Sequence, residues 1–138
     1  MLPRVAAYLD SRDWNDVPVM QDRNFTVSPL AQGEYNLNFL ISCASLQLVF
    51  RVNIGTQINR DDQVLYEYRA LELLAQSGVT PRPHFVDDTR QVFDRGILIM
   101  EYLPGEPMDY RRDLWDAAGH RSDCHRRSGA RSAPRHLP

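Results

Sequence analysis

The sequence contains no lysine, and all 16 of its basic residues are arginines. This absence excludes any mechanism that needs a lysine amine as nucleophile or base. No apolar run approaches the roughly 20 residues that a membrane-spanning helix needs. The N-terminus also lacks the charged and apolar regions of a signal peptide. We therefore expect a cytoplasmic protein with no membrane partner.

The sequence also has few cysteines and little net charge. The two cysteines, Cys43 and Cys124, stand far apart, so we expect unpaired thiols in a reducing compartment rather than a disulfide. The net charge of −2 gives no reason to expect nucleic acid as a partner. With 138 residues, of which 43% are apolar, the chain can form one domain or one lobe of a larger one.

The stretch 25–53 is the most regular part of the sequence. Apolar side chains occupy every second position at Leu37, Phe39 and Ile41, and this period of two predicts a strand with one apolar face. We expect a first strand over 25–30, a second after a glycine turn, and a third after a tight bend at residues 44–45.

Two residues of this stretch could meet an anion. A glycine between strands, here Gly33, lets the backbone approach a negatively charged group closely. Arg51 follows Phe50 in the third strand, so the two side chains point to opposite faces of the sheet. If Phe50 faces the core, Arg51 faces the side on which a ligand could lie.

The other expected elements follow from periodicity and turn signals. In chain order they are a helix over 3–11, a connection over 12–24, a helix over about 62–76, a short strand over 84–86, a turn over 87–90, a buried strand over 96–102 and a further helix beginning within 108–115. Together with the stretch 25–53 they predict an α+β fold, an antiparallel sheet of about five strands packed with one main helix.

The helix over 62–76 has the clearest boundaries. Asp61 or Asp62 can cap its first turn, and Gly78 follows its end as a C′ glycine. Its apolar positions form one stripe: Val64, Leu65, Tyr68, Leu71, Leu74 and Ala75.

Four segments together resemble the N-terminal lobe of the aminoglycoside phosphotransferase and choline kinase-like family, which has the protein-kinase-like fold. They are LAQGEYNLNFLI at 30–41, LVFRV at 48–52, YEYRALELLAQSGVTPRP at 66–83 and ILIMEYLPGEPMDY at 97–110. The resemblance divides the chain into a helix and connector over 1–24, a kinase-like lobe with hinge over 25–118 and a disordered basic tail over 119–138. It implies an ATP-dependent transfer of the γ-phosphate to the hydroxyl of a small molecule.

The same resemblance assigns the phosphate contacts of ATP. Gly33 and Asn36 match the glycine-containing loop that covers the phosphates in this family. Arg51 stands where a basic residue, more often lysine, contacts the α- and β-phosphates, and Glu67 matches the helix glutamate that pairs with it. Alternatively, Gly33 is only a hairpin turn, Arg51 a solvated arginine and Glu67 an ordinary surface charge.

The resemblance also assigns the adenine contacts. The backbones of Glu101 and Leu103 match the hinge that hydrogen-bonds to adenine, and Met100 stands at the gatekeeper-like position. Val49 and Ile99 would add apolar contact to the purine. An alternative is a core strand followed by a Pro-Gly turn. A third hypothesis is a small α+β domain of unrelated role, and a structure with Arg51 and Glu67 on opposite sides of the sheet would favour it.

The catalytic signatures of the family are missing from the sequence. No His-Gly-Asp, His-Arg-Asp or Asp-Phe-Gly tripeptide occurs, so we assign no catalytic residue and no ligand for the Mg²⁺ that the family uses. His120, Cys124 and His125 lack the partners of a metal site. We expect a chain that is inactive alone, with self-association through an exposed inter-lobe face, or a non-catalytic nucleotide-binding or protein-interaction module. After residue 118 the composition changes abruptly to one rich in Arg, Ser, His and Pro. This change suggests a reading-frame change or a premature end.

Overall fold

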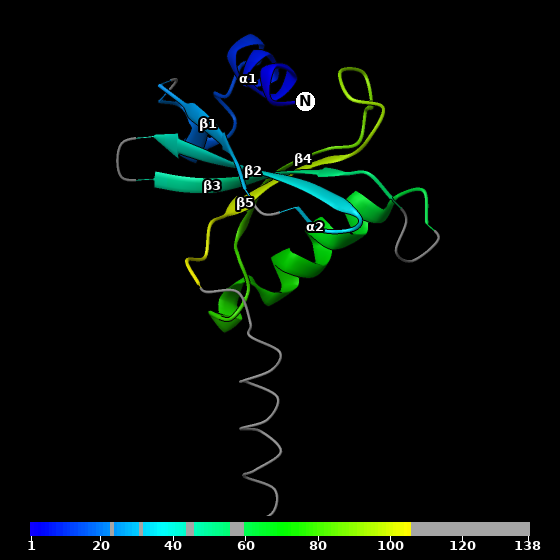
Figure 1. The fold of residues 1–138 in the computed structure, drawn as a ribbon. Coiled ribbons are helices and arrows are strands. Elements are labelled where there is room, and N and C mark those ends of the chain that lie inside the picture. The colour runs from blue at the N-terminus through cyan, green and yellow to red at the C-terminus, as the bar shows by residue number, and fades with distance from the viewer. Residues whose placement is uncertain (23, 31, 44–45, 56–59, 106–138) are drawn as a thin grey trace, which may run out of the picture. The chain divides into compact units, whose positions relative to one another are not determined.

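A computed structural model describes residues 1–22, 24–30, 32–43, 46–55 and 60–105 of the chain (Figure 1). The elements of this part all belong to one compact unit, Met1–Leu103. The expected helix beginning within 108–115, the tail over 119–138 and Cys124 lie outside the described residues. The elements, in chain order, are α1 (Leu2–Ser11), η1 (Pro18–Met20), β1 (Thr26–Pro29), β2 (Asn36–Cys43), β3 (Leu46–Asn53), α2 (Gln63–Leu74), η2 (Ala75–Ser77), β4 (Pro83–Asp87) and β5 (Ile97–Glu101).

The five strands form one antiparallel sheet in the order β1-β2-β3-β5-β4. Phe50 is the central residue, since it lies opposite Phe39 on β2 and opposite Ile99 on β5. The expected α+β fold, with its meander of three strands and its buried strand near residue 100, is confirmed.

The sheet has two covered faces, with α1 on one side and α2 on the other (Figure 1). The α1 face carries the larger apolar cluster, in which Phe50 and Val52 are fully buried. The α2 face carries a smaller cluster built on Val49, Leu98 and Met100. Because side chains alternate along β3, Phe50 lies in the large cluster and Arg51 faces α2, as the sequence predicts.

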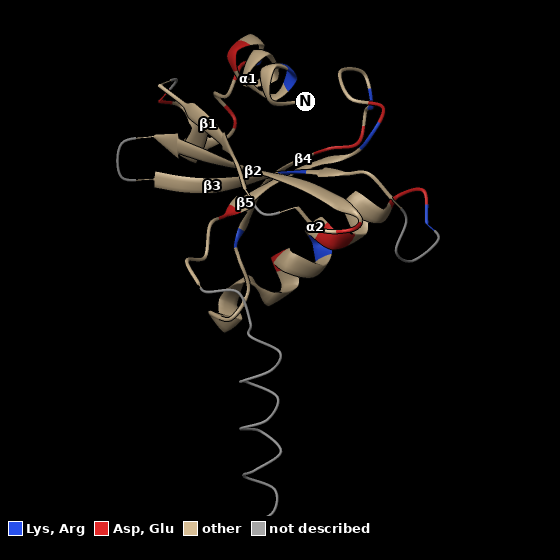
Figure 2. Ribbon diagram, in the orientation of Figure 1, with Lys and Arg blue, Asp and Glu red and all other residues tan. Residues whose placement is uncertain are grey.

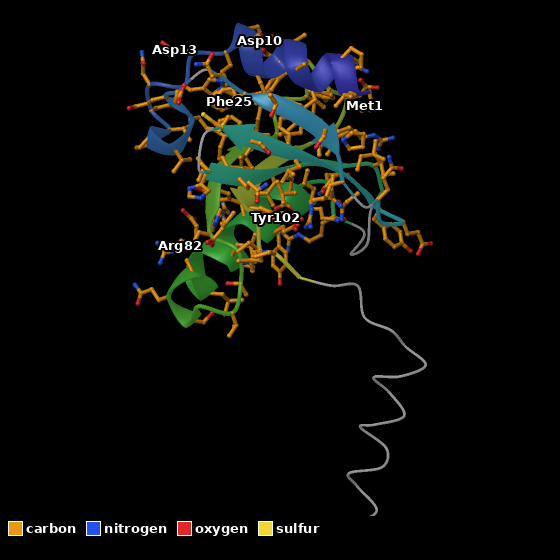
Figure 3. All side chains as sticks on the ribbon, turned by 60° about the vertical axis from the view of Figure 1, so that its left-hand side comes forward. Met1, Asp10, Asp13, Phe25, Arg82 and Tyr102 are labelled. Atoms are coloured by element: carbon orange, nitrogen blue, oxygen red, sulfur yellow. The ribbon has the colours of Figure 1, made fainter. Side chains whose placement is uncertain are left out.

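The segment 12–24, expected to be only a connection, contributes to this large cluster. Trp14, Val17 and Met20 from it are all buried, and the indole nitrogen of Trp14 donates to the carbonyl of Leu9 at 2.8 Å. Figure 3 shows the start of this segment beside the end of α1, from Asp10 to Asp13. Trp14 packs edge-on against Tyr8 of α1 and Phe85 of β4. The segment has no helical or strand period because its burial depends on tertiary packing rather than on one element's face.

Helix α2 ends as expected but begins differently. Gly78 has a φ of 71° after η2, the left-handed conformation that glycine adopts without a steric penalty. Asp62 occupies the N-cap position, yet its side chain makes no capping hydrogen bond. Its two carboxylate oxygens instead accept hydrogen bonds from Arg60, both at 2.8 Å. The predicted side-chain cap is therefore wrong, because an arginine two residues earlier competes for the carboxylate.

The apolar stripe of α2 is buried only in part. Val64 is buried, and Leu65, Tyr68 and Leu71 pack against the cluster on the sheet. Leu74 is 49% exposed, although it lies on the same stripe. Packing on the sheet therefore stops at about the last turn of the helix.

Candidate functional site

Arg51 and Glu67 meet between β3 and α2. Arg51 Nη1 donates to Glu67 Oε1 in an ion pair, and Arg51 Nε donates to Asn38 Oδ1 at 3.0 Å. The Arg51 and Glu67 side chains are 24% and 25% exposed. The predicted pairing is confirmed, and the arrangement expected of an unrelated domain, with the two residues on opposite sides of the sheet, is wrong.

A cavity of about 190 Å³ lies beside this ion pair, and we call it the Arg51 cavity. Its lining residues are Leu30, Asn38, Val49, Arg51, Pro81, Met100, Glu101, Tyr102 and Leu103. Five of the predicted nucleotide contacts are thus brought together: Val49, Arg51, Met100, Glu101 and Leu103. The expected purine contact from Ile99 is wrong, because neighbouring residues of β5 point to opposite faces and Ile99 lies in the large cluster on the α1 face. The walls are mostly apolar with one cation at the side, an arrangement suited to a flat apolar group attached to an anion.

The sequence interpretation missed four of the lining residues. Asn38 could have been found, because it lies directly opposite Arg51 in the β2–β3 register. Leu30 follows β1 and donates its backbone N–H to the Asn38 carbonyl at 3.0 Å. Pro81 and Tyr102 come from chain segments that only the folded sheet brings to this place.

The predicted hinge, from Glu101 at the end of β5 to Leu103, is held by backbone hydrogen bonds. The Glu101 amide donates to the Arg82 carbonyl at 2.8 Å, and the Tyr102 amide donates to the Gln47 carbonyl at 3.3 Å. The carboxylate of Glu101 accepts a further hydrogen bond from the Arg82 amide at 3.2 Å. A backbone donor for a ligand at this end of the Arg51 cavity must therefore come from Leu103.

Gly33 lies in the turn between β1 and β2, Asn36 is the first residue of β2, and neither lines the Arg51 cavity. The Gly33 amide donates to the Asn36 carbonyl at 3.1 Å. A Cβ at Gly33 would meet only that carbonyl oxygen, at 4.0 Å, so packing does not require glycine there. The amide oxygen of Asn36 is buried and has no hydrogen-bond partner in the described part of the chain.

Acidic and basic residues are interspersed around these elements (Figure 2). Burial lowers the pKa of His84 on β4. The negative charge of Glu101 opposes part of this shift, and the positive charge of Arg82 adds to it. The described residues contain no group of three or more His, Cys, Asp or Glu side chains that could hold a metal ion. No helix within them is both long and apolar enough to cross a membrane.

Comparison with known proteins assigns the chain to a protein family. The profile of a family described as the phosphotransferase enzyme family matches residues 26–124, more than half of the chain. The chain therefore belongs to this family. No curated protein sequence matches it significantly.

One solved structure is similar, the crystal structure of a "putative aminoglycoside phosphotransferase" from Ralstonia eutropha JMP134. The two chains are 18% identical and superpose with a TM-score of 0.50. The match covers 77% of this chain and 29% of that chain, so this chain spans under a third of its length. At this identity the likeness shows a shared fold and nothing more.

Proposed function

We propose that this chain provides the nucleotide-binding part of an ATP-dependent phosphotransferase, which transfers the γ-phosphate of ATP to a hydroxyl group of a small molecule. The observation that carries the proposal is the ion pair between Arg51 and Glu67 at the side of the Arg51 cavity. An arginine fixed in this way can bind phosphate oxygens with two parallel hydrogen bonds.

Each wall of the Arg51 cavity has a role in this proposal. Val49 and Met100, which lie opposite each other in the β3–β5 register and on the same face of the sheet, would both contact the purine from the side of the sheet, and the backbones of Glu101 and Leu103 would bind its edge. Arg51 would contact the α- and β-phosphates, while Glu67 and Asn38 hold its guanidinium in place. Gly33 in the β1–β2 turn and Asn36 at the start of β2 would cover the phosphates.

The described residues suit ATP better than they suit its metal. The apolar walls and the cation fit a purine nucleotide, whereas no set of carboxylates there could hold Mg²⁺. Phosphoryl transfer depends on metal and acceptor positioning for most of its rate. We therefore propose that this chain alone binds ATP without transferring phosphate, in the cytoplasm, and that acceptor recognition needs residues other than those of the Arg51 cavity.

A titration of the 138-residue chain with ATP, followed by calorimetry, tests this proposal. We expect saturable binding that is weakened at least about tenfold in Arg51→Gln, because a charge-assisted phosphate contact is lost. Arg69→Gln, an exposed arginine of α2 outside the cavity, is the matched control and should bind as the original chain does. Equal affinities for the Arg51 and Arg69 variants would contradict the assignment of Arg51.

A non-catalytic interaction module is the second candidate, and exposed apolar residues favour it. Leu73 and Val79, at the end of α2 and just after it, are 86% and 80% exposed. We propose self-association through these residues, to be measured by sedimentation. A dimer that dissociates in Leu73→Glu but still binds ATP would support both properties, and a monomer at all concentrations would contradict self-association.

A further inference from the structure

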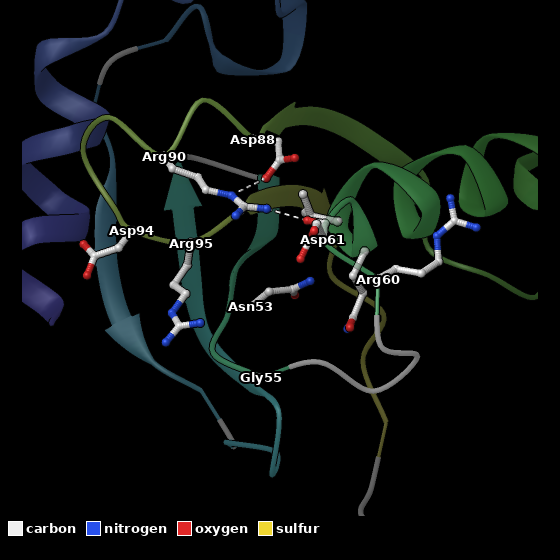
Figure 4. A pocket seen from close by; sticks show the side chains of 11 residues that line it. Asn53, Gly55, Arg60, Asp61, Asp88, Arg90, Asp94 and Arg95 are labelled. Atoms are coloured by element: carbon white, nitrogen blue, oxygen red, sulfur yellow. Dashed lines mark hydrogen bonds and ion pairs between the residues drawn. The ribbon is translucent and has the colours of Figure 1, made fainter.

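A second cavity, of about 130 Å³, lies where three elements start or end (Figure 4). We call it the Asn53 cavity. Asn53 is the last residue of β3, Gln63 and Val64 open α2, and Arg95 and Gly96 precede β5. It shares no lining residue with the Arg51 cavity.

Asn53 is the feature that points to a ligand. Its side chain projects from β3 into the cavity, between Arg95 on one side and Asp61 and Arg60 on the other (Figure 4). The residue is only 7% exposed, and neither its amide nitrogen nor its amide oxygen has a hydrogen-bond partner within the described ranges. Buried amides are normally paired, so this site lacks one acceptor and one donor that a ligand could supply.

Most of the charged side chains around the cavity neutralise one another. Arg90 donates to the Asp88 carboxylate and to the Asp61 carbonyl. Arg60 is paired with Asp62, and its guanidinium points away from the cavity (Figure 4).

Two charges stay available, those of Arg95 and of Asp61. Asp94 lies 4.0 Å from Arg4 and so has a distant partner. Among the residues that the structure describes, neither the guanidinium of Arg95 nor the carboxylate of Asp61 has an ion pair. A ligand of the Asn53 cavity would therefore meet one cation and one anion.

The start of α2 adds a further source of positive potential. The helix has 12 residues, and the side chain of its N-cap residue, Asp62, makes no capping hydrogen bond. The amide groups of such a turn carry partial positive charge and bind phosphate and carboxylate groups. Gln63 and Val64 of this turn line the cavity, so the helix start and the Asn53 amide face the same space.

We propose that the Asn53 cavity binds a phosphate group that retains a proton. Arg95, the Asn53 amide nitrogen and the start of α2 would donate to the phosphate oxygens. The single hydrogen of the P–O–H group would be shared between the Asp61 carboxylate and the Asn53 amide oxygen, a contact that sulfate cannot make at neutral pH. Phosphate can make it, because the second pKa of a phosphate monoester is about 6.

The size of the cavity agrees with this ligand. Its volume of about 130 Å³ exceeds the roughly 30 Å³ that one water molecule takes up in the liquid. A single tetrahedral oxyanion therefore fits. The site is separate from the proposed ATP site, and the experiment can test each without the other.

Calorimetric titration of the 138-residue chain at pH 6 with inorganic phosphate, with a simple phosphate monoester and with sulfate tests the proposal. We expect phosphate to bind at least about tenfold more tightly than sulfate, because sulfate leaves the Asp61 carboxylate and the Asn53 oxygen unpaired. Tighter binding of methyl phosphate, the monoester, than of inorganic phosphate would identify a phosphorylated molecule as the preferred ligand. The reverse order would identify the free phosphate ion. Equal binding of phosphate and sulfate would overturn the proposal.

Four variants locate the binding site. Arg95→Gln should weaken phosphate binding at least about tenfold, while Arg82→Gln, an exposed arginine at the opposite end of β5, should leave it unchanged. Asn53→Leu should abolish phosphate binding and raise the melting temperature, because it removes an unpaired buried amide. Phosphate binding that is lost in Arg51→Ala but retained in Arg95→Gln would place the ion at the Arg51 cavity and overturn the assignment. A lower melting temperature for Asn53→Leu would contradict the unpaired amide.

Discussion

Arg51 on β3 and Glu67 on α2 form an ion pair that joins the sheet to the helix that covers it. Both side chains are about three-quarters buried, so the pair is less screened by solvent than a surface ion pair. Asn38 on the neighbouring strand holds the guanidinium from a second direction, at 3.0 Å. The cation is therefore held in place by three elements before any ligand arrives.

Removing the carboxylate should weaken both the fold and the proposed ATP site. We expect Glu67→Gln to lower the free energy of unfolding by about 1–2 kcal/mol, since a partly buried guanidinium loses its charged partner. Urea denaturation measures this, and Glu72→Gln, an exposed glutamate of the same helix, is the matched control. In a double-mutant cycle with Arg51→Gln the two effects should not add, and strict additivity would contradict a coupled pair.

The Arg51–Glu67 pair was predictable because each residue stands in a regular element. Alternation along β3 fixes the face of Arg51, and the family resemblance selects Glu67 on the helix. The Asn53 cavity was not predictable, because Asn53, Gln63 and Arg95 are far apart in the sequence and none stands in a recognisable motif. The burial of Trp14 likewise depends on packing that no period reveals.

Gly96 should be the glycine least tolerant of substitution among those described. A Cβ there would lie 2.3 Å from Val64 Cγ1 and 2.7 Å from Val64 Cβ, far inside contact distance. Gly96→Ala must push α2 away from the sheet and should cost about 1–3 kcal/mol of stability. Gly33→Ala, which meets only one atom at 4.0 Å, is the control and should change stability by less than about 0.5 kcal/mol. Similar melting temperatures for the two variants would contradict this packing.

Tyr8 ties α1 to the end of β4, since its hydroxyl donates to Asp87 Oδ2 at 2.6 Å. Burial acts to raise the pKa of Asp87, but hydrogen bonds from Tyr8 and Thr89 outweigh it and hold that pKa below its usual value. A carboxyl with a depressed pKa stabilises the folded state at neutral pH, and this contribution is lost as the pH falls through its folded pKa. Tyr8→Phe should lower stability by about 1 kcal/mol at pH 7.

The difference between Tyr8→Phe and the original chain should then shrink in acid. Urea denaturation at pH 7 and at pH 3 measures it, with Tyr66→Phe, a 52% exposed tyrosine, as the control. A difference that stays constant over this range would show that the hydroxyl acts without the Asp87 charge.

His84 should make stability sensitive to mild acid at a higher pH than Asp87 does. Burial lowers the pKa of His84, and Arg82 adds to this while Glu101 opposes it. The unfolded chain therefore takes up the proton first, so stability falls as the pH drops below the ordinary histidine pKa of about 6.5. It stops falling once the folded state is protonated as well.

Replacing His84 should remove this pH dependence. We expect the urea midpoint of the original chain to fall between pH 7.5 and pH 5.5, and that of His84→Gln to change less. Glu101→Gln should make the fall steeper, because it removes the charge that favours the protonated imidazole. If the original chain and His84→Gln lost stability equally over this range, another group would carry the effect. The charge of Glu101 acts on His84, and Glu101 lines the Arg51 cavity. Protonation of His84 should therefore also alter the ATP affinity of that cavity.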